Sequence, residues 1–269
     1  MSRFLETMAQ RSRDRVETAA RGLPVDELRD SALSAPGPRP LGDFGASFDL
    51  IAEVKPRSPS EGVFPERAPG TAAEGYERGG AAAISVLTEP SEFGGSLDQL
   101  RTVSAMVSVP VMAKDFIVDP YQVYQARQSG ADGILVIARI LDDDTAAGIL
   151  DAAADLGMFS LLEAFDGVDL ARLPALAAGR PDVLVGVNCR DLETLDIVPE
   201  RHEELAGQLP PGPVAVAESA IGGPVDVERV ASLGYGAALV GSALMRSGDP
   251  TGLVRGMVDA GRRAVAVTS

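Results

Sequence analysis

The feature that most restricts the fold of this chain is a repeat of short apolar runs, rich in β-branched residues, that alternate with segments of helical periodicity. The eight runs are DLIAEV (49–54), AAISVLT (82–88), PVMAKDF (110–116), DGILVIA (132–138), MFSLLEAF (158–165), DVLVGVN (182–188), PVAVAES (213–219) and AALVG (237–241). Successive runs begin 22 to 33 residues apart, the length of one strand followed by one crossover helix. Helical segments such as 120–130 and 144–157 lie between them and end in glycine, the expected helix stop.

Eight strand–helix units in 269 residues predict an α/β fold, a closed (β/α)8 TIM barrel. The competing arrangement is a doubly wound open sheet, which usually has fewer strands and a glycine-rich nucleotide turn. No G-x-G-x-x-G motif follows any of the runs, so the pattern favours the barrel.

Residues 1–48 precede the first run and are predicted to form an N-terminal helical extension packed on the barrel, which itself would span 49–269. Within the extension, 3–20 has the apolar stripe of a charged amphipathic helix, and 33–42 is expected to be a loop. The extension carries too little apolar material to fold as a separate domain.

Composition excludes several classes of protein. The chain has 24 Lys+Arg against 39 Asp+Glu, and its net charge of −15 disfavours nucleic acid and anionic membranes as partners. No apolar run approaches the roughly 20 residues that span a bilayer, and one cysteine excludes an internal disulfide framework, so we expect a cytoplasmic protein. With one histidine and one cysteine, a metal site is poorly supplied, and none is predicted.

Polar residues interrupt the apolar runs where each predicted strand ends. The ionisable ones are Glu53, Lys55, Lys114, Glu163, Arg190 and Glu218. Any one of them is as well explained by a solvated strand end, but charges within apolar runs are costly unless they are paired or functional. Because barrel active sites form at the carboxyl ends of the strands, we expect three cations and three acids around one mouth, a set suited to proton transfers on an anionic substrate.

Two turns of small residues indicate a phosphate site. ESAIGGP (218–224) and VGSALMR (240–246) follow the last two strands and lead into predicted helices. Barrels often bind phosphate at these two loops through backbone N–H groups. A Gly-Ser turn alone is weak evidence for a phosphate site, but its position after the last strand strengthens the prediction.

At this level of detail the chain resembles the indole-3-glycerol-phosphate synthase family of tryptophan biosynthesis. The resemblance extends over nearly the whole chain, through IAEVKPRSPSEG (51–62), SVLTEPSEFGGSLDQL (85–100), PVMAKDFIVDPYQVYQARQSGADGILVIARIL (110–141), VGVNCRDLETLDI (185–197), AESAI (217–221) and LVGSALMRSGDP (239–250). It implies a carboxy-lyase that closes, decarboxylates and dehydrates 1-(2-carboxyphenylamino)-1-deoxyribulose 5-phosphate without metal or organic cofactor.

The resemblance also implies roles for individual residues. Lys114 would be the general acid of ring closure, Glu163 would serve proton transfers in dehydration, and Lys55, held by Glu53, would meet the substrate carboxylate or act as a second acid. The division of these roles among Lys55, Glu53 and Glu163 stays open. The resemblance places further positions around the substrate: Asn188, Glu218, Ser219 and Arg190 at the sugar, lysines and carboxylate, Phe93 and Phe116 at the aromatic ring, and Ser58, Ala220, Gly241 and Ser242 at the phosphate.

Three positions depart from the family pattern. Ala220 stands where the family usually has glycine, Phe165 where it often has histidine, and Pro56 where it usually has a basic residue. Two alternatives stay open beside the lyase: an isomerase of a related phosphoribosyl compound, and a barrel that binds the ligand without turnover as a partner subunit. The second of these is motivated by Ala220 and Phe165. We expect a monomer or weak homo-oligomer, and the resemblance admits association with other tryptophan-pathway enzymes.

Three other features have plain structural interpretations. His202, in the polar stretch PERHEELAG, is predicted to be a surface residue, and Cys189 to be a packed thiol facing away from the barrel axis. The acidic run 141–148 is interpreted as a helix N-cap.

Overall fold

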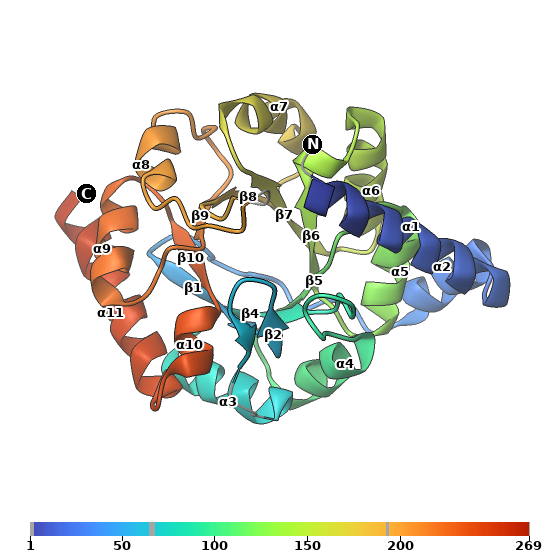
Figure 1. Cartoon of the computed structure of the whole chain (residues 1–269), viewed down its shortest axis with the longest axis horizontal. Coiled ribbons are helices and arrows are strands. Elements are labelled where there is room, and N and C mark those ends of the chain that lie inside the picture. Colours follow the sequence, from blue (N-terminus) through green and yellow to red (C-terminus); the bar gives the residue numbers. More distant parts are fainter. Residues whose placement is uncertain (1–2, 65–67, 192–193, 269) are drawn as a thin grey trace.

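From residue 49 onward, each barrel strand is followed by a helix in the computed structural model, which describes residues 3–64, 68–191 and 194–268. The parallel strands close in the order β1-β10-β9-β8-β7-β6-β5-β4 (Figure 1). Their bounds are β1 Asp49–Val54, β4 Ala83–Leu87, β5 Val111–Lys114, β6 Gly133–Ile137, β7 Phe159–Ala164, β8 Val183–Asn188, β9 Ala215–Glu218 and β10 Ala237–Val240. The predicted (β/α)8 barrel is confirmed, and each strand lies within the apolar run that predicted it.

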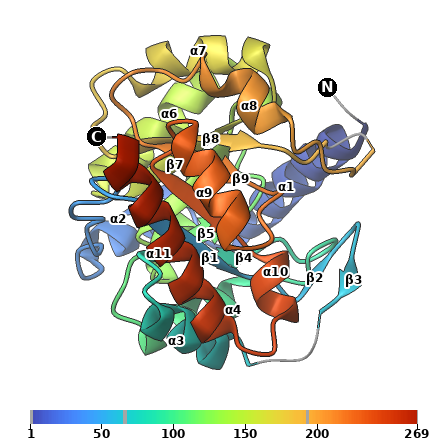
Figure 2. The same ribbon diagram turned by 90° about the vertical axis from the view of Figure 1, so that its left-hand side faces the viewer.

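Helices cover the outside of the barrel. They are α3 Pro69–Gly79, α4 Leu97–Met106, α5 Pro120–Gln128, η1 Ala138–Ile140, α6 Asp143–Asp155, α7 Gly167–Ala177, α8 Arg201–Ala206, α9 Pro224–Ser232, α10 Ser242–Arg246 and α11 Pro250–Thr268. A small antiparallel hairpin of β2 (Arg57–Ser58) and β3 (Gly62–Val63) follows β1. It projects on the same side of the molecule as the N-terminal helix (Figure 2). None of the described helices is long and apolar enough to cross a membrane.

Burial on both faces explains why the strands appear in the sequence as continuous apolar runs. Every residue of β1, β7 and β8 is buried, because one face points into the barrel and the other is covered by helices. A charged residue inside such a run therefore enters the protein interior, and only its partners or its function can stabilise it there.

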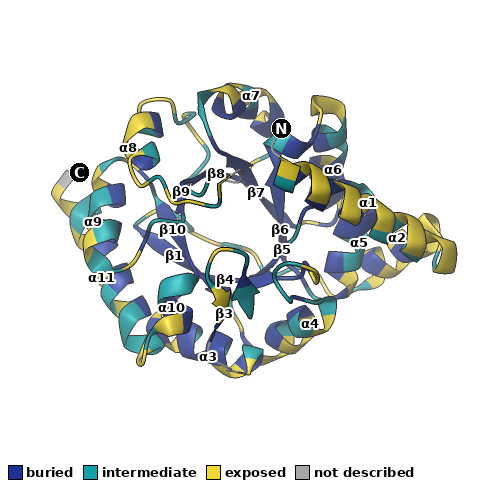
Figure 3. Ribbon diagram, viewed as in Figure 1, coloured by how far each residue is buried: buried dark blue, intermediate teal, exposed yellow. Residues whose placement is uncertain are grey.

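The N-terminal segment contains α1 (Arg3–Gly22) and α2 (Val25–Ser34). Helix α1 buries Leu5, Met8 and Ala9 and leaves its polar face exposed across the side of the barrel formed by β5 and β6 (Figure 3). Helix α2 packs against α5. The loop predicted over 33–42 begins only after Ser34, because α2 continues to that residue.

The prediction for His202 was wrong. Helix α8 is a short helix whose His202 faces inward, is 0% exposed and packs edge-on against Tyr235 with ring centroids 5.3 Å apart. Burial, assisted by the positive charge of Arg229, lowers the pKa of His202 to about 4, so the imidazole is neutral. Cys189 is buried as predicted, and Asp142 caps α6 by accepting a hydrogen bond from the Thr145 amide.

A group of charges at the amino end of the barrel, which we call the basal cluster, consists of Arg39, Arg127 and Asp132. Arg39 Nε donates to Asp132 Oδ2 over 2.7 Å, and the Arg39 amide donates to Oδ1 over 2.9 Å. Arg127 Nη1 lies 3.5 Å from Oδ1, and the Val111 amide donates to Oδ2 over 2.8 Å. This cluster joins the extension to β5 and β6 at the end of the barrel opposite the strand-end acids and lysines.

Candidate active site

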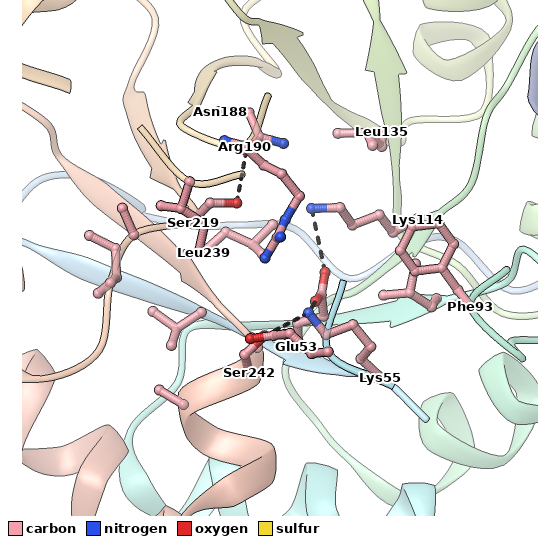
Figure 4. A pocket seen from close by; sticks show the side chains of 18 of the residues that line it. Glu53, Lys55, Phe93, Lys114, Leu135, Asn188, Arg190, Ser219, Leu239 and Ser242 are labelled. Atoms are coloured by element: carbon pink, nitrogen blue, oxygen red, sulfur yellow. Dashed lines mark hydrogen bonds and ion pairs between the residues drawn. The ribbon is translucent and has the colours of Figure 1, made fainter. Parts of the chain in front are cut away.

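A cavity of about 360 Å³ opens at the carboxyl ends of the strands. Twelve of the residues predicted from sequence line it: Glu53, Lys55, Phe93, Lys114, Phe116, Glu163, Asn188, Arg190, Ser219, Ala220, Gly241 and Ser242. Figure 4 shows Lys55, Lys114 and Arg190 directed into the same space from different strands and loops. Side chains separated by up to about 190 residues thus meet around one cavity, as the barrel prediction requires.

Two predicted residues do not line the cavity. Glu218 lies beneath it, 1% exposed, with Oε2 3.0 Å from Lys114 Nζ. Ser58 lies on β2, where its hydroxyl is 3.3 Å from that of Ser60. Glu218 therefore contacts the site through Lys114, and Ser58 belongs to the hairpin beside the mouth.

The centre of the site is a group of two lysines and two glutamates. Lys55 Nζ is 3.2 Å from Glu53 Oε1, and Lys114 Nζ is 3.4 Å from Glu53 Oε2. Lys114 also pairs with Glu218, so each ammonium group contacts Glu53 and one of them contacts a second acid. Alternation along β1 places Glu53 and Lys55 on the same face, which allows one carboxylate to lie between both amines.

Burial and charge act in opposite directions on these groups. Burial alone would favour the neutral form of Glu53, but the positive charges of Lys55 and Lys114 outweigh it and lower the pKa of this carboxyl. Burial also opposes the ammonium form of Lys114, and the negative charges of Glu218, Glu53 and Glu163 overcome it and raise its pKa above the ordinary lysine value. Both groups are therefore ionised.

Glu163 behaves differently from the other two acids. Burial, followed by the negative charge of Glu218, raises the pKa of Glu163 to about 8. Asn188 Nδ2 donates to its Oε1 over 2.6 Å and holds the carboxyl in place. Glu163 also shares a side-chain hydrogen bond with Glu218, which favours the protonated form of Glu163. An acid with a pKa near neutrality can exchange protons during a reaction.

Two glycines create the space for these acids. A Cβ on Gly186 of β8 would lie 2.2 Å from Glu218 Oε1, and one on Gly241 would lie 2.4 Å from Glu53 Oε1. Both distances are shorter than any real contact, so any side chain there would displace a carboxylate. Glycine at 186 and 241 therefore allows a carboxylate to lie against the backbone. Neither glycine has a positive φ, so conformation is not the reason for glycine there.

Asn188 connects the site to the loop after β9. Its Oδ1 accepts hydrogen bonds from the Ser219 hydroxyl over 2.8 Å and from the Arg190 amide over 2.9 Å. The following turn is left-handed at Ser219 (φ 64°) and at Ala220 (φ 56°). The turn thus keeps a conformation that favours glycine although neither residue is glycine.

The side of the cavity near β10 contains residues that sequence reasoning missed. Lys55 Nζ donates to Ser242 Oγ over 3.1 Å, and the Ser242 hydroxyl donates to the carboxylate of Glu61 on the hairpin. Glu61 Oε1 also lies 3.3 Å from Arg246 Nη1. Both Glu61 and Arg246 line the cavity. Both residues lie within the stretches that carry the family resemblance, but a contact between hairpin and helix has no periodic signal.

The opposite wall is apolar and aromatic. Phe93 and Phe116 have ring centroids 6.2 Å apart at an interplanar angle of 43°, and Phe4 of α1 packs edge-on against Phe116. Leu135 and Leu239 add aliphatic surface to the lining. A flat aromatic ring fits between such groups. In the described part of the chain, no group of three or more His, Cys, Asp or Glu residues is arranged to hold a metal ion.

The fold and the site together define a (β/α)8-barrel enzyme whose cavity combines lysines and carboxyl groups with an aromatic wall. The family model described as indole-3-glycerol phosphate synthase matches residues 5–257. The chain belongs to this family of carboxy-lyases.

Individual relatives agree. The chain is 47% identical to indole-3-glycerol phosphate synthase of a Nocardioides species over 236 residues, which cover 86% of this chain and 88% of that protein. It is 43% identical to the protein of the same name from Mycobacteroides abscessus over 252 residues, covering 92% and 91%. Among solved structures, 3-hexulose-6-phosphate synthase from Salmonella typhimurium superposes with a TM-score of 0.65 at 16% identity, over 81% of this chain and 100% of that one, which shows a shared fold.

Proposed function

We propose that this chain converts 1-(2-carboxyphenylamino)-1-deoxyribulose 5-phosphate into indole-3-glycerol phosphate, carbon dioxide and water, with the residue roles given below. The observation that carries these roles is the group of lysines and glutamates in one cavity beside an aromatic wall. The aromatic ring of the substrate lies against Phe93 and Phe116, and its phosphate lies near Ala220, Gly241 and Ser242, with Ser58 approaching from the hairpin.

The substrate is held by its polar groups as well. Lys55 and Arg190 line the cavity and attract the carboxylate, while Asn188 and Ser219 meet the sugar hydroxyls. Glu218 and Glu53 fix the ammonium group of Lys114 from below. Binding in this orientation brings the carboxylate-bearing ring carbon toward the carbonyl carbon of the sugar chain, which is the bond that must form.

Ring closure requires a proton at the carbonyl oxygen. As the ring carbon attacks, the carbonyl π electrons move to oxygen, and Lys114 gives that oxygen a proton. An alkoxide is more basic than an amine, so the transfer is favourable although the surrounding acids raise the pKa of Lys114. Carbon dioxide then leaves with its C–C bonding electrons returned to the ring, which restores aromaticity.

Dehydration requires one acid and one base. We assign the base to Glu163, because a carboxylate whose pKa is raised to about 8 is a stronger proton acceptor than an ordinary one. It takes a proton from the carbon next to nitrogen, those C–H electrons form the new double bond, and Lys55 protonates the leaving hydroxyl. Lys114 and Lys55 each give one proton and Glu163 takes one, so the substrate gains one proton in all. This balances the negative charge of the carboxylate that leaves as neutral carbon dioxide.

The remaining assignments extend this proposal. Residues 1–48 act as an extension of the barrel at 49–269, since α1 contributes Phe4 to the aromatic wall. The enzyme works in the cytoplasm as a monomer or weak homo-oligomer, needs no metal or organic cofactor, and takes a small phosphorylated substrate. The alternative of a ligand-binding barrel without turnover draws on Ala220 and Phe165, but Phe165 is buried beneath Arg139 and does not line the cavity.

One assay tests the proposal. The chain contains no tryptophan, so indole fluorescence from added substrate has little protein background. We expect product from wild type and a loss of about 10³-fold or more in kcat for Lys114→Ala. Lys114→Arg is the matched control, because arginine keeps the positive charge but cannot release its proton at working pH. Binding without product in wild type, or an active Lys114→Arg, would contradict the assignment.

A further inference from the structure

The tip of the β2–β3 hairpin places an anion of the chain itself beside the predicted phosphate position. The Glu61 carboxylate accepts a hydrogen bond from Ser242 and pairs with Arg246, and its side chain is only 15% exposed. The ammonium group of Lys55 donates to the same Ser242 hydroxyl. A hydroxyl, a guanidinium and a nearby ammonium group form the surroundings that an anionic ligand requires.

The hairpin is held to this position by several contacts. Phe64, which follows β3, lies beneath both cations, with Lys55 Nζ 5.4 Å and the Arg246 guanidinium 5.5 Å from its ring centroid. Next to Glu61, the Ser60 hydroxyl accepts a hydrogen bond from Arg190 Nη1 over 2.6 Å. The hairpin tip is thus bound at the groups that the proposed function assigns to the substrate.

We propose that Glu61 is an internal occupant of the phosphate position, that the substrate phosphate displaces it, and that Arg246, once released from Glu61, becomes a phosphate ligand. This inference rests on the proposed function for the position of the phosphate at Ser242. Exchange of one anion for another leaves Arg246 with an anionic partner both before and after binding, and Lys55 keeps its pair with Glu53 throughout. Phosphate binding then frees the hairpin tip, and the binding energy is reduced by the cost of displacing Glu61.

The experiment measures binding of inorganic phosphate and needs no turnover. Val63 of β3 is 80% exposed, and the chain lacks tryptophan, so Val63→Trp introduces a single fluorescent reporter into the hairpin. We expect phosphate to change the fluorescence anisotropy of this reporter as the tip is released. In the same background, Glu61→Gln and Glu61→Asp should each tighten phosphate binding about fivefold.

The aspartate variant distinguishes two effects of Glu61: direct contact with Ser242 and Arg246, and electrostatic repulsion of phosphate by its negative charge. It keeps the negative charge, but its side chain is one methylene shorter and does not reach Ser242 and Arg246 together. If Glu61 weakened phosphate binding only through space, Glu61→Asp would behave like wild type, and that result would overturn the proposal. Glu92→Gln is the matched control, since Glu92 lies in the loop after β4 and pairs with Arg11 over 2.7 Å. We expect it to change phosphate affinity by less than about twofold.

Arg246→Gln tests the second part of the proposal. We expect it to weaken phosphate binding about fivefold, while Arg263→Gln, which removes an exposed arginine paired with Glu228 on the outer helices, leaves it unchanged. Unchanged affinity in Arg246→Gln would remove Arg246 from the site. A wild type that binds phosphate in competition with Glu61 but makes no indole product would refute the proposed reaction and leave this inference intact.

Discussion

Each end of the barrel carries a cluster of acids and cations, but the acids of the two clusters have different neighbours. In the basal cluster, both oxygens of Asp132 accept hydrogen bonds from Arg39 and backbone amides, and Arg127 lies beside them. At the carboxyl end, Glu163 and Glu218 are two acids that contact each other, and the pKa of Glu163 is raised to about 8. The basal acid is surrounded by donors alone, whereas Glu163 lies beside another acid and can gain or lose a proton near neutral pH.

The cations differ in the same sense. The basal cluster uses arginine, whereas the only two lysines of the 269-residue sequence, Lys55 and Lys114, both lie in the cavity. Arginine does not release its proton at physiological pH, while a lysine can do so when its surroundings change. The comparison indicates that an acid paired with arginines stabilises the fold, whereas lysines beside a carboxyl group that titrates near neutral pH are available for chemistry.

Asp132→Ala should remove the stabilising effect of the basal cluster. Removing the carboxylate takes the anion away from two guanidinium groups and the acceptor from the Arg39 and Val111 amides, so we expect a loss of about 3–5 kcal/mol in the free energy of unfolding. Urea denaturation measures this loss. If the variant is too unstable to purify, Asp132→Asn keeps one acceptor oxygen and should lose less. At a temperature where the variant is folded, kcat should stay within about twofold of wild type, and a large fall in kcat would show that the two ends are coupled.

Glu163→Gln should have the converse effect at the carboxyl end. Glutamine keeps the shape and the contact with Asn188 but cannot accept a proton, so kcat should fall roughly hundredfold with little change in KM. Equal losses in kcat and affinity would argue against a chemical role. Stability should not fall, because the variant removes a buried acid that lies beside the charge of Glu218.

The dependence of kcat/KM on pH shows whether Glu163 acts as a base or as an acid. As a base it must be ionised, and with a pKa of about 8 only about a tenth of it is ionised at pH 7. The ratio kcat/KM should therefore rise with pH, bend near pH 8 and level off about one unit higher, and Glu163→Gln should abolish this rise. A wild-type profile that falls through pH 8 would instead make Glu163 the acid of dehydration and Lys55 no longer necessary in that role.

Gly186→Ala should produce a smaller effect by displacing an acid without removing it. The added methyl group would overlap Glu218 Oε1, so the carboxylate must shift and its contact with Lys114 must change, and we expect kcat to fall about tenfold. Gly148→Ala is the matched control, because a Cβ there meets nothing within 4 Å and alanine favours the interior of α6. If both variants kept wild-type kcat, the contact between Glu218 and Lys114 would not matter for turnover.

Sequence reasoning predicted what local patterns determine. The strand runs, and the polar residues that end them, follow from periodicity and from the cost of burying charge, and twelve predicted residues line the cavity. The placement of Glu61 against Ser242 and Arg246 depends on where a hairpin folds back, and that has no periodicity. The six-residue helix around His202 is too short for its buried face to show in the sequence, so its polar neighbours predicted a surface position.

Ala220→Gly should have the smallest effect, and it tests whether a departure from the family pattern alters the site. Alanine at φ 56° costs about 1 kcal/mol relative to a relaxed backbone, but glycine raises the entropy of the unfolded chain by a similar amount, so stability should change by less than about 1 kcal/mol. Glycine and alanine donate the same amide hydrogen, and the turn is already left-handed, so KM should stay within about twofold. Ser219→Gly, which relieves the same type of conformation but deletes the hydrogen bond to Asn188, should raise KM more. A several-fold lower KM in Ala220→Gly would show that alanine had displaced the phosphate turn, and the departure would then have a functional consequence.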